Sequence, residues 1–269
     1  MITMNEQGNL VYHGDTFQIV LQRYSDPERL NAARNAAIYL GKKDRGNVRR
    51  PLSIIRQGHV PEVFRGEFAE FEFVDVSKEV YDHIITYTTR NMRVAGGNRA
   101  LTSDDFAMPD DKMKNPDLVH EMIQQSLDNY QKLLEIGETP QVSRSAMPVN
   151  AKINPFVYQF NFVTLMQSLF KQRIWEKGAQ GNTVKVVQGM WELVNQVDPD
   201  LWQTAYEWFG QPATDWTEVR RKIKKKCVDV TTILEMLEED LMSVGENIDS
   251  GTPFEDWLVS KFGEQKSMW

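Results

Sequence analysis

The stretch RNMRVAGGNR, residues 90–99, places three arginines around two adjacent glycines. Guanidinium groups bind phosphate oxygens through paired hydrogen bonds, and glycine leaves backbone N–H groups accessible to an anion. The stretch therefore predicts a site for a phosphorylated ligand, and a solvated basic turn is the alternative interpretation. Because an arginine at a phosphate contributes binding and orientation, the stretch alone does not specify a reaction.

The chain has the composition of an ordinary globular protein. It has 269 residues, of which 41% are hydrophobic and 26% are charged, and its net charge is -7. This length fits one large domain, or one domain with an appendage. The acidic balance argues against nucleic acid as the main partner, because duplex binding requires a basic surface. A nucleotide needs only a few local arginines, so the charge does not exclude one.

Several classes of site and setting are disfavoured. Cys227 is the single cysteine, which excludes an intramolecular disulfide and a cysteine-ligated metal, and the four histidines stand apart, so we expect no metal site. The sequence contains no apolar run of the roughly 18 residues that a membrane-spanning helix needs. Residues 1–6 lack the basic and apolar segments of a secretory signal. We therefore expect a cytoplasmic protein that does not bind membranes.

The N-terminal part of the chain mixes strands with short helices. Residues 16–21 and 68–76 are rich in apolar residues at strand spacing, which predicts two strands. Asp26 and Pro27 favour a helix start, because aspartate accepts backbone N–H bonds and proline suits the first helical position. Further helices are expected at 51–57 and after Ser77, and the latter is expected to carry Arg90 and Arg93 at its end, before Gly96 and Gly97.

From Asn115 onward the sequence predicts almost only helix. The segment 155–175 is apolar on nearly every side, which is typical of a buried central helix. Helices are expected at about 116–136, 155–175, 183–197, 199–209, 214–244 and after Pro253.

Five short elements in one order resemble the flavin-dependent thymidylate synthase family. They are Ala32-Ala33-Arg34, Gly58-His59, residues 90–98, Arg144 with Pro148, and Asn161. The resemblance covers about residues 15–200. It implies an α+β fold, with a flavin-dependent thymidylate synthase-like domain at 1–200 and a helical C-terminal extension at 201–269 packed on it.

The match to the family signature is incomplete. The Arg-His-Arg of the family reads Arg90-Asn91-Met92-Arg93 here, with one residue inserted and the histidine replaced. The later serine of the family is Leu101 or Thr102, and Arg173 is displaced by one residue from the arginine that closes the family's site. These departures concern the residues expected to carry the chemistry.

The resemblance also implies roles for particular residues. Arg144 and Arg173 would be catalytic, and Arg99 together with Arg144 would bind the substrate. The expected flavin-binding residues are His59, Arg90, Arg93, Asn98, Asn161 and Gln167. Without the family, His59 beside a glycine would more often be a surface or capping residue.

The implied reaction is transfer of a one-carbon unit to C5 of a pyrimidine deoxynucleotide such as dUMP. The donor would be methylenetetrahydrofolate, FAD would supply hydride, and NADPH would reduce the FAD. The resemblance implies a homotetramer with sites shared between subunits. The resemblance thus implies a methyltransferase and flavoprotein of nucleotide biosynthesis, and the incomplete signature also allows an altered nucleotide or a hydroxymethyl product.

Two interpretations from other classes stay open. The chain can be a noncatalytic nucleotide-binding or scaffold relative that keeps the fold. The run of basic residues from Arg220 to Lys226 can contact nucleic acid. A solvated helix face is favoured for this run, because Glu238-Glu239-Asp240 balances it further along.

Overall fold

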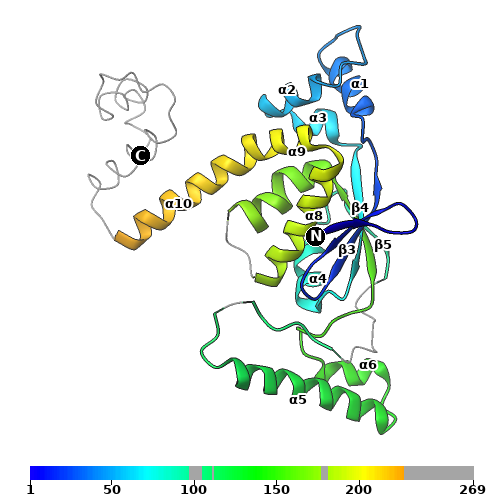
Figure 1. Ribbon diagram of the computed structural model, residues 1–269, viewed down its shortest axis with the longest axis vertical. Coiled ribbons are helices and arrows are strands. Elements are labelled where there is room, and N and C mark those ends of the chain that lie inside the picture. Colours follow the sequence, from blue (N-terminus) through cyan, green and yellow to red (C-terminus); the bar gives the residue numbers. More distant parts are fainter. Residues whose placement is uncertain (97–104, 111, 177–180, 227–269) are drawn as a thin grey trace. The chain divides into compact units, whose positions relative to one another are not determined.

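The computed structural model describes residues 1–96, 105–110, 112–176 and 181–226 (Figure 1). The chain divides into two compact units, Met1–Pro212 and Ala213–Trp269. The second unit is described only through helix α10 (Gln211–Lys226). Cys227 and the helix expected after Pro253 lie outside the described residues. The extension expected at 201–269 stays a prediction.

The first unit is built on a six-stranded antiparallel sheet in which sequence order and spatial order differ at one edge. Among the described residues, the last strand along the chain lies between the fourth and fifth strands. In spatial order the strands are β1 (Ile2–Met4), β2 (Leu10–His13), β3 (Gln18–Tyr24), β4 (Phe68–Val74), β6 (Phe156–Asn161) and β5 (Met92–Ala95). The strands predicted at 16–21 and 68–76 are thus confirmed as β3 and β4.

The predicted central helix at 155–175 is wrong in its first third. Residues 156–161 form β6, and helix begins only with α7 (Phe162–Thr164). The chain then continues in π-helical turns, η2 (Leu165–Leu169) and η3 (Lys171–Trp175). The physical reason is strand pairing. Because β4 and β5 hydrogen-bond to the two edges of this segment, its backbone N–H and C=O groups find partners when it is a strand.

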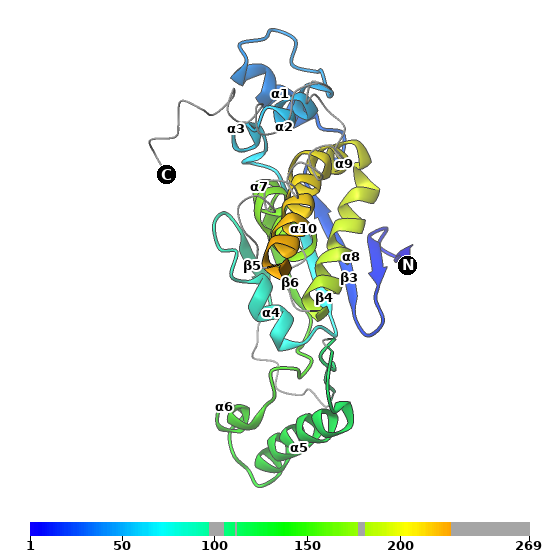
Figure 2. The ribbon, with the colours of Figure 1, turned by 90° about the vertical axis from the view of Figure 1, so that its left-hand side faces the viewer.

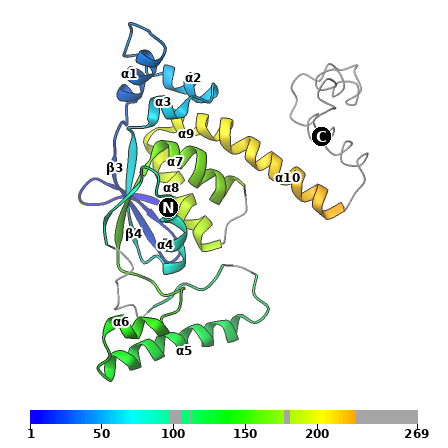
Figure 3. The ribbon, with the colours of Figure 1, turned by 180° about the vertical axis from the view of Figure 1, so that it is seen from behind.

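Helices cover one face of the sheet. Helix α8 (Gly181–Val197) contacts β2 and β3, and α4 (Lys78–Ile84) and α9 (Pro199–Ala205) pack against α8 (Figure 2). At one end of the sheet lie α1 (Leu30–Tyr39), α2 (Arg50–Arg56) and α3 (Val60–Phe64), and at the other end lie α5 (Pro116–Glu135), α6 (Pro140–Ser143) and the 3-10 turn η1 (Arg144–Ala146) (Figures 1 and 3).

Helix ends follow the sequence signals only in part. The side chain of Asn115 accepts a hydrogen bond from the Leu118 N–H, which confirms the start of α5. Asp26 also accepts N–H bonds, from Asn31 and Ala32, but the helix begins at Leu30 and not at the proline. Helix α4 ends at Ile84, so the expectation that Arg90 and Arg93 close this helix is wrong.

Gly96 lets two strands approach each other closely. Its φ is +76°, and a Cβ built there would lie 2.7 Å from the carbonyl oxygen of Pro155 and 2.8 Å from Cα of Phe156. A side chain at this position would therefore strain the backbone and separate β5 from β6. Gly96 is therefore explained by contact with the neighbouring strand segment.

Aromatic side chains fill the space between the sheet and the helices. Phe71, Phe73, Phe156 and Phe160 are fully buried, and the rings of Phe73 and Phe156 stack at a centroid distance of 4.8 Å. These residues alternate along β4 and β6, so each strand directs every second side chain into the same core.

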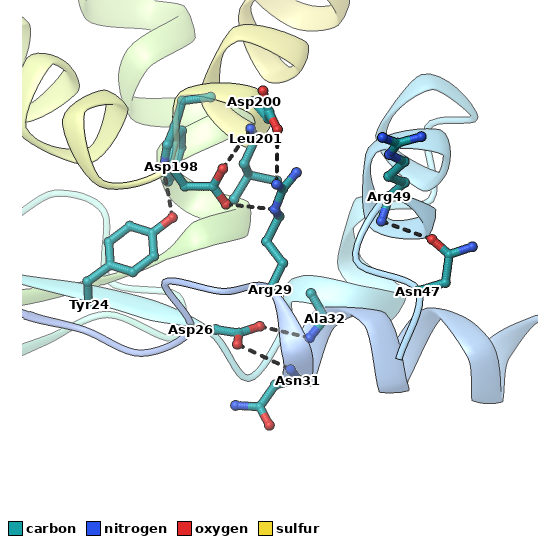
Figure 4. A network of polar contacts seen from close by, with 11 residues as sticks. Tyr24, Asp26, Arg29, Asn31, Ala32, Asn47, Arg49, Asp198, Asp200 and Leu201 are labelled. Atoms are coloured by element: carbon teal, nitrogen blue, oxygen red, sulfur yellow. Dashed lines mark hydrogen bonds and ion pairs between the residues drawn. The ribbon is translucent and has the colours of Figure 1, made fainter. Parts of the chain in front are cut away.

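A polar network joins the start of α1 to the start of α9 (Figure 4). Arg29 adopts a left-handed φ of 59°, and its Nε and Nη2 lie 3.1 Å from carboxylate oxygens of Asp198 and Asp200 respectively. Asp198 also caps α9 by accepting from the Leu201 N–H at 3.1 Å. Burial raises the pKa of Asp198, and the hydrogen bond from Leu201 and the charge of Arg29 oppose that rise. One arginine thus ties two segments far apart in sequence.

We expect Phe71→Ala to lower the free energy of unfolding by about 3–5 kcal/mol, because the substitution opens a cavity in a fully buried aromatic core. Urea denaturation measures the change. Met4→Ala is the matched control, since Met4 is 68% exposed and surface truncations change stability by about 0.5 kcal/mol or less. Equal effects of the two substitutions would contradict the assignment of the core.

Glu67 generates a prediction about pH. Burial raises its pKa, and the hydrogen bond from the Ser25 hydroxyl to Oε2 at 2.6 Å opposes this only in part. Its contribution to stability is therefore fully present below the unfolded pKa of about 4.3 and is lost as the pH rises through the folded pKa. We expect Glu67→Gln, which keeps an acceptor for Ser25, to become more stable relative to the wild type as the pH rises. A stability difference that stays constant from acid to neutral pH would contradict this.

Candidate functional site

Two of the predicted arginines meet at helix α4. Arg93, on β5, donates from Nη1 to the hydroxyl of Tyr81 at 3.3 Å. Arg173, on η3, donates from Nη2 to the carbonyl oxygen of His83 at 3.4 Å. Tyr81 and His83 both belong to α4, so the two guanidinium groups converge on one helix from separate elements.

Tyrosine hydroxyls complete this region. Arg173 donates from Nε to the hydroxyl of Tyr87 at 3.1 Å, and the hydroxyl of Tyr158 donates to the Tyr87 carbonyl at 3.3 Å. Burial raises the pKa of Tyr87 and of Tyr158, while Arg173 and Arg93, respectively, oppose the rise. Both phenols therefore stay neutral near pH 7 and act as hydrogen-bonding groups. We call Tyr81, Tyr87, Arg93, Tyr158 and Arg173 the arginine–tyrosine corner.

An asparagine pair fixes the chain beside this corner. The side chain of Asn91 donates to the Tyr87 carbonyl at 2.7 Å and accepts from the backbone N–H of Asn161 at 2.8 Å. Asn161 in turn donates from Nδ2 to the carbonyls of Arg65 at 2.7 Å and Glu67 at 3.1 Å. Its Oδ1 accepts from the Val163 N–H at 3.0 Å and so caps α7. Asn91 lies between the two arginines that resemble the family's Arg-His-Arg, and here it joins β5 to the end of β6.

Arg144 lies on η1 beside a small apolar cluster that contains Tyr130. Its Nε is buried without a hydrogen-bond partner, and the hydroxyl of Tyr130 is buried and unpaired as well. Burial raises the pKa of Tyr130, and the positive charge of Arg144 opposes the rise. The other two guanidinium nitrogens of Arg144 are not buried, and they form no hydrogen bond with any residue that the structure describes.

The predicted arginines share one electrostatic property. Within the described ranges, Arg90, Arg93, Arg144 and Arg173 form no ion pair with a carboxylate. Arg34, Arg45, Arg49 and Arg56 likewise show none there, whereas Arg23, Arg29, Arg50 and Arg65 each have an acidic partner within 4.0 Å. Arginines left without a carboxylate partner attract an anionic ligand. Arg90 also adopts a left-handed φ of 62°, a conformation that residues with a Cβ rarely adopt.

The remaining predicted residues lie elsewhere or outside the described chain. His59 is exposed at the start of α3, with its Nδ1 at 3.3 Å from the Tyr39 hydroxyl. Gln167 is half-buried on η2. Asn98 and Arg99 fall in the range 97–104, which the structure does not describe.

Within the described part of one chain, the predicted site residues therefore lie at three separate places. His59 is on α3 at one end of the sheet, the arginine–tyrosine corner lies at β5, and Arg144 is on η1 beside α5 and α6 at the other end (Figure 1). Among the residues described, no side-chain hydrogen bond or ion pair links η1 to the arginine–tyrosine corner. The roles given to these residues stay predictions.

The structure also shows partners that sequence reasoning missed. Tyr81, Tyr87, Tyr130 and Tyr158 each lie beside a predicted arginine, yet no motif marks them. Tyr158 carried no usable signal, because the run of residues around it is apolar at nearly every position. Tyr87 carried a weak one, standing three residues before Arg90.

A cavity of about 220 Å³ lies apart from these residues. It is lined by the start of β3, the turn after β4 and the start of α8, and Lys185 bridges Asp15 at 3.3 Å and Asp110 at 3.1 Å on its wall. None of the predicted site residues lines it. In the part of the chain that the structure covers, no helix has the length and apolar character needed to cross a membrane.

The fold agrees with the comparisons to known proteins. The family described as thymidylate synthase complementing protein matches residues 20–200. Because this match spans well over half of the sequence, the chain belongs to that family, the flavin-dependent thymidylate synthases. The predicted α+β fold with a helical C-terminal region is confirmed.

A solved structure has a similar fold. The UMP/dUMP methylase PolB from Streptomyces cacaoi, bound with 5-Br dUMP, aligns with a TM-score of 0.54 over 72% of this chain and 96% of that chain. The two sequences are 16% identical, so the likeness concerns the fold. A comparison with curated proteins found no match.

We expect Asn161→Asp to lower the free energy of unfolding about as much as Asn161→Ala does, by roughly 2–3 kcal/mol. Aspartate keeps the oxygen that caps α7 but replaces the two donors that bind the Arg65 and Glu67 carbonyls. Thermal and urea unfolding measure both variants. If Asp restored most of the stability lost in the Ala variant, capping alone would explain the residue.

Proposed function

We propose that the chain transfers a one-carbon unit to C5 of dUMP. In this proposal methylenetetrahydrofolate is the donor, and FAD, reduced by NADPH, is the redox cofactor. The protein acts in the cytoplasm as a homotetramer in which neighbouring subunits share each site. Membership of the thymidylate synthase complementing protein family supports this proposal.

The unpaired state of Arg144 supports the proposal most directly. Its Nε is buried without a partner, and its two accessible nitrogens have none among the described residues. Leaving a half-buried charged group unsatisfied costs free energy, and an anionic ligand offsets that cost when it binds. The phosphate of a nucleotide matches the forked geometry of a guanidinium group.

The residues around the arginine–tyrosine corner fit a flavin nucleotide in part. Arg90 and Arg93 are exposed cations without a carboxylate partner, and they suit the pyrophosphate of FAD. Gln167 on η2 offers a further polar group, whereas His59 lies at the start of α3 and would contribute to the flavin site from a separate place in the chain. Asn161 fits less well, because both hydrogens of its amide already bond backbone carbonyls. We therefore assign Asn161 to holding the protein backbone near the flavin.

When bound, reduced FAD supplies the hydride that completes the transferred methyl group. The residues of this chain bind and orient the nucleotide and polarise its pyrimidine ring. In the proposal, Arg144 and Arg99 hold the nucleotide phosphate, and Arg173 places positive charge beside the pyrimidine, where negative charge develops as C5 becomes nucleophilic. The absence of a suitable cysteine nucleophile is compatible with such positioning chemistry.

A noncatalytic nucleotide-binding relative is the second candidate. The observation that favours it is that no histidine stands between Arg90 and Arg93, where Asn91 instead holds the backbone. A relative that has lost catalytic activity would bind dUMP without converting it, and it would be colourless if FAD binding were also lost.

Ligand stabilisation tests the proposed substrate. At a dUMP concentration 100 times the Kd, we expect the free energy of unfolding to rise by about 2.7 kcal/mol, which raises the Tm by several degrees. Arg144→Ala should weaken dUMP binding about 10- to 100-fold, because it removes charge-assisted hydrogen bonds worth about 1.5–3 kcal/mol. Isothermal titration measures both proteins. Arg45→Ala, at an exposed arginine in the loop after α1, is the matched control and should bind as the wild type does.

The product identifies the reaction. Incubation with dUMP, methylenetetrahydrofolate, FAD and NADPH, followed by mass spectrometry, separates methylated from hydroxymethylated nucleotide. Unchanged dUMP with a bound flavin would support the noncatalytic candidate. Failure of dUMP, FAD and UMP alike to stabilise the protein would refute the nucleotide site.

A further inference from the structure

The guanidinium group of Arg173 is held along one edge. Its Nε donates to the hydroxyl of Tyr87 at 3.1 Å, and its Nη2 donates to the His83 carbonyl at 3.4 Å. Its Cζ lies 5.8 Å from the centre of the Tyr87 ring. Two anchors on one planar group fix both its position and its rotation.

Tyr87 is itself fixed in a way that determines the direction of its hydrogen bonds. Its hydroxyl donates to Oε1 of Gln172 at 2.7 Å, so the single hydroxyl proton is used there and the oxygen accepts from Arg173. The backbone carbonyl of Tyr87 accepts from the Tyr158 hydroxyl and from the Asn91 side chain. Tyr87 is thus held at both its backbone and its phenol.

The remaining part of the Arg173 guanidinium is free. In the stretches that the structure describes, Arg173 has no carboxylate partner and its Nη1 has no hydrogen-bond partner. Nη1 of Arg173 is also accessible to solvent, because it has no partner and is not buried. An arginine with one edge anchored and the other unoccupied is preorganised for an anionic ligand.

We propose that Tyr87 is a positioning residue, whose hydroxyl holds Arg173 in the orientation that binds the pyrimidine nucleotide. This inference rests on the proposed function and assigns a role to a residue outside the family signature. Tyr87 acts through Arg173 and does not itself contact the nucleotide. Removing its hydroxyl leaves the charge of Arg173 in place but releases the guanidinium to rotate.

A double-mutant cycle with dUMP as the ligand tests the inference. Tyr87→Phe keeps the ring and removes the hydroxyl, and we expect it to weaken dUMP binding about tenfold, because a charge-assisted hydrogen bond that orients the ligand-binding group is lost. Arg173→Ala should weaken binding about 10- to 100-fold. The double variant should bind no more weakly than Arg173→Ala, within about twofold, because Tyr87 has no other route to the ligand.

Two further variants separate positioning from general destabilisation. Tyr206→Phe also removes a tyrosine hydroxyl, one that donates to Gln211 at 3.0 Å and takes no part in the arginine–tyrosine corner. This variant should leave dUMP affinity unchanged. Gln172→Leu removes the acceptor that orients the Tyr87 hydroxyl and should weaken binding in the same direction as Tyr87→Phe. It also provides the test if Tyr87→Phe fails to fold, which the Tm reveals.

The outcomes are distinct. Losses that multiply in the double variant, or wild-type affinity in Tyr87→Phe, would overturn the positioning role while leaving the proposed function intact. If the wild-type protein binds neither dUMP nor UMP, the proposed function fails and the positioning role fails with it.

Discussion

The insertion of β6 between β4 and β5 is the constraint on which the rest of the structure depends. Strand β6 pairs antiparallel with both neighbours, so Phe68 lies opposite Asn161 on one side and Met92 lies opposite Gln159 on the other. Both edges of the backbone are thereby bonded within the sheet. Because side chains alternate along a strand, the same pairing directs the phenylalanines into the helical side. A shift of one residue would exchange the two faces and expose the core.

This pairing also determines where the chemically important groups lie. Asn161 ends β6 and bonds backbone groups near the start of β4, while its own N–H binds Asn91 beside β5. The chain then turns directly into the helical segment that carries Arg173. Three strands and one helix are thus fixed around a single asparagine. Arginines that have no acidic partner stand beside a rigid scaffold, which suits recognition of a phosphorylated ligand.

Local patterns in the sequence were sufficient for some elements and insufficient for others. The alternation in Phe68–Val74 is visible without the structure, and Asn115-Pro116 marks a helix start by capping chemistry alone. The run after Pro155 is apolar at nearly every position, so the alternation typical of a strand was not visible in its sequence. This segment is a strand because it pairs with β4 and β5, which are distant in sequence. The family signature located Arg93 and Arg173 in sequence. It gave no information on Tyr81 and Tyr87, because those contacts depend on how α4 meets β5 and η3 in space.

The helix after Asn161 winds through wide π turns at Leu165–Leu169 and Lys171–Trp175. A π turn accommodates one residue more than an α turn before the same side of the helix returns. An arginine displaced by one position along the sequence can therefore face the direction that its counterpart faces on a tighter helix. The spacing of a motif along such a segment is consequently a poor guide to its geometry, and one added amino acid can be absorbed without moving the guanidinium group.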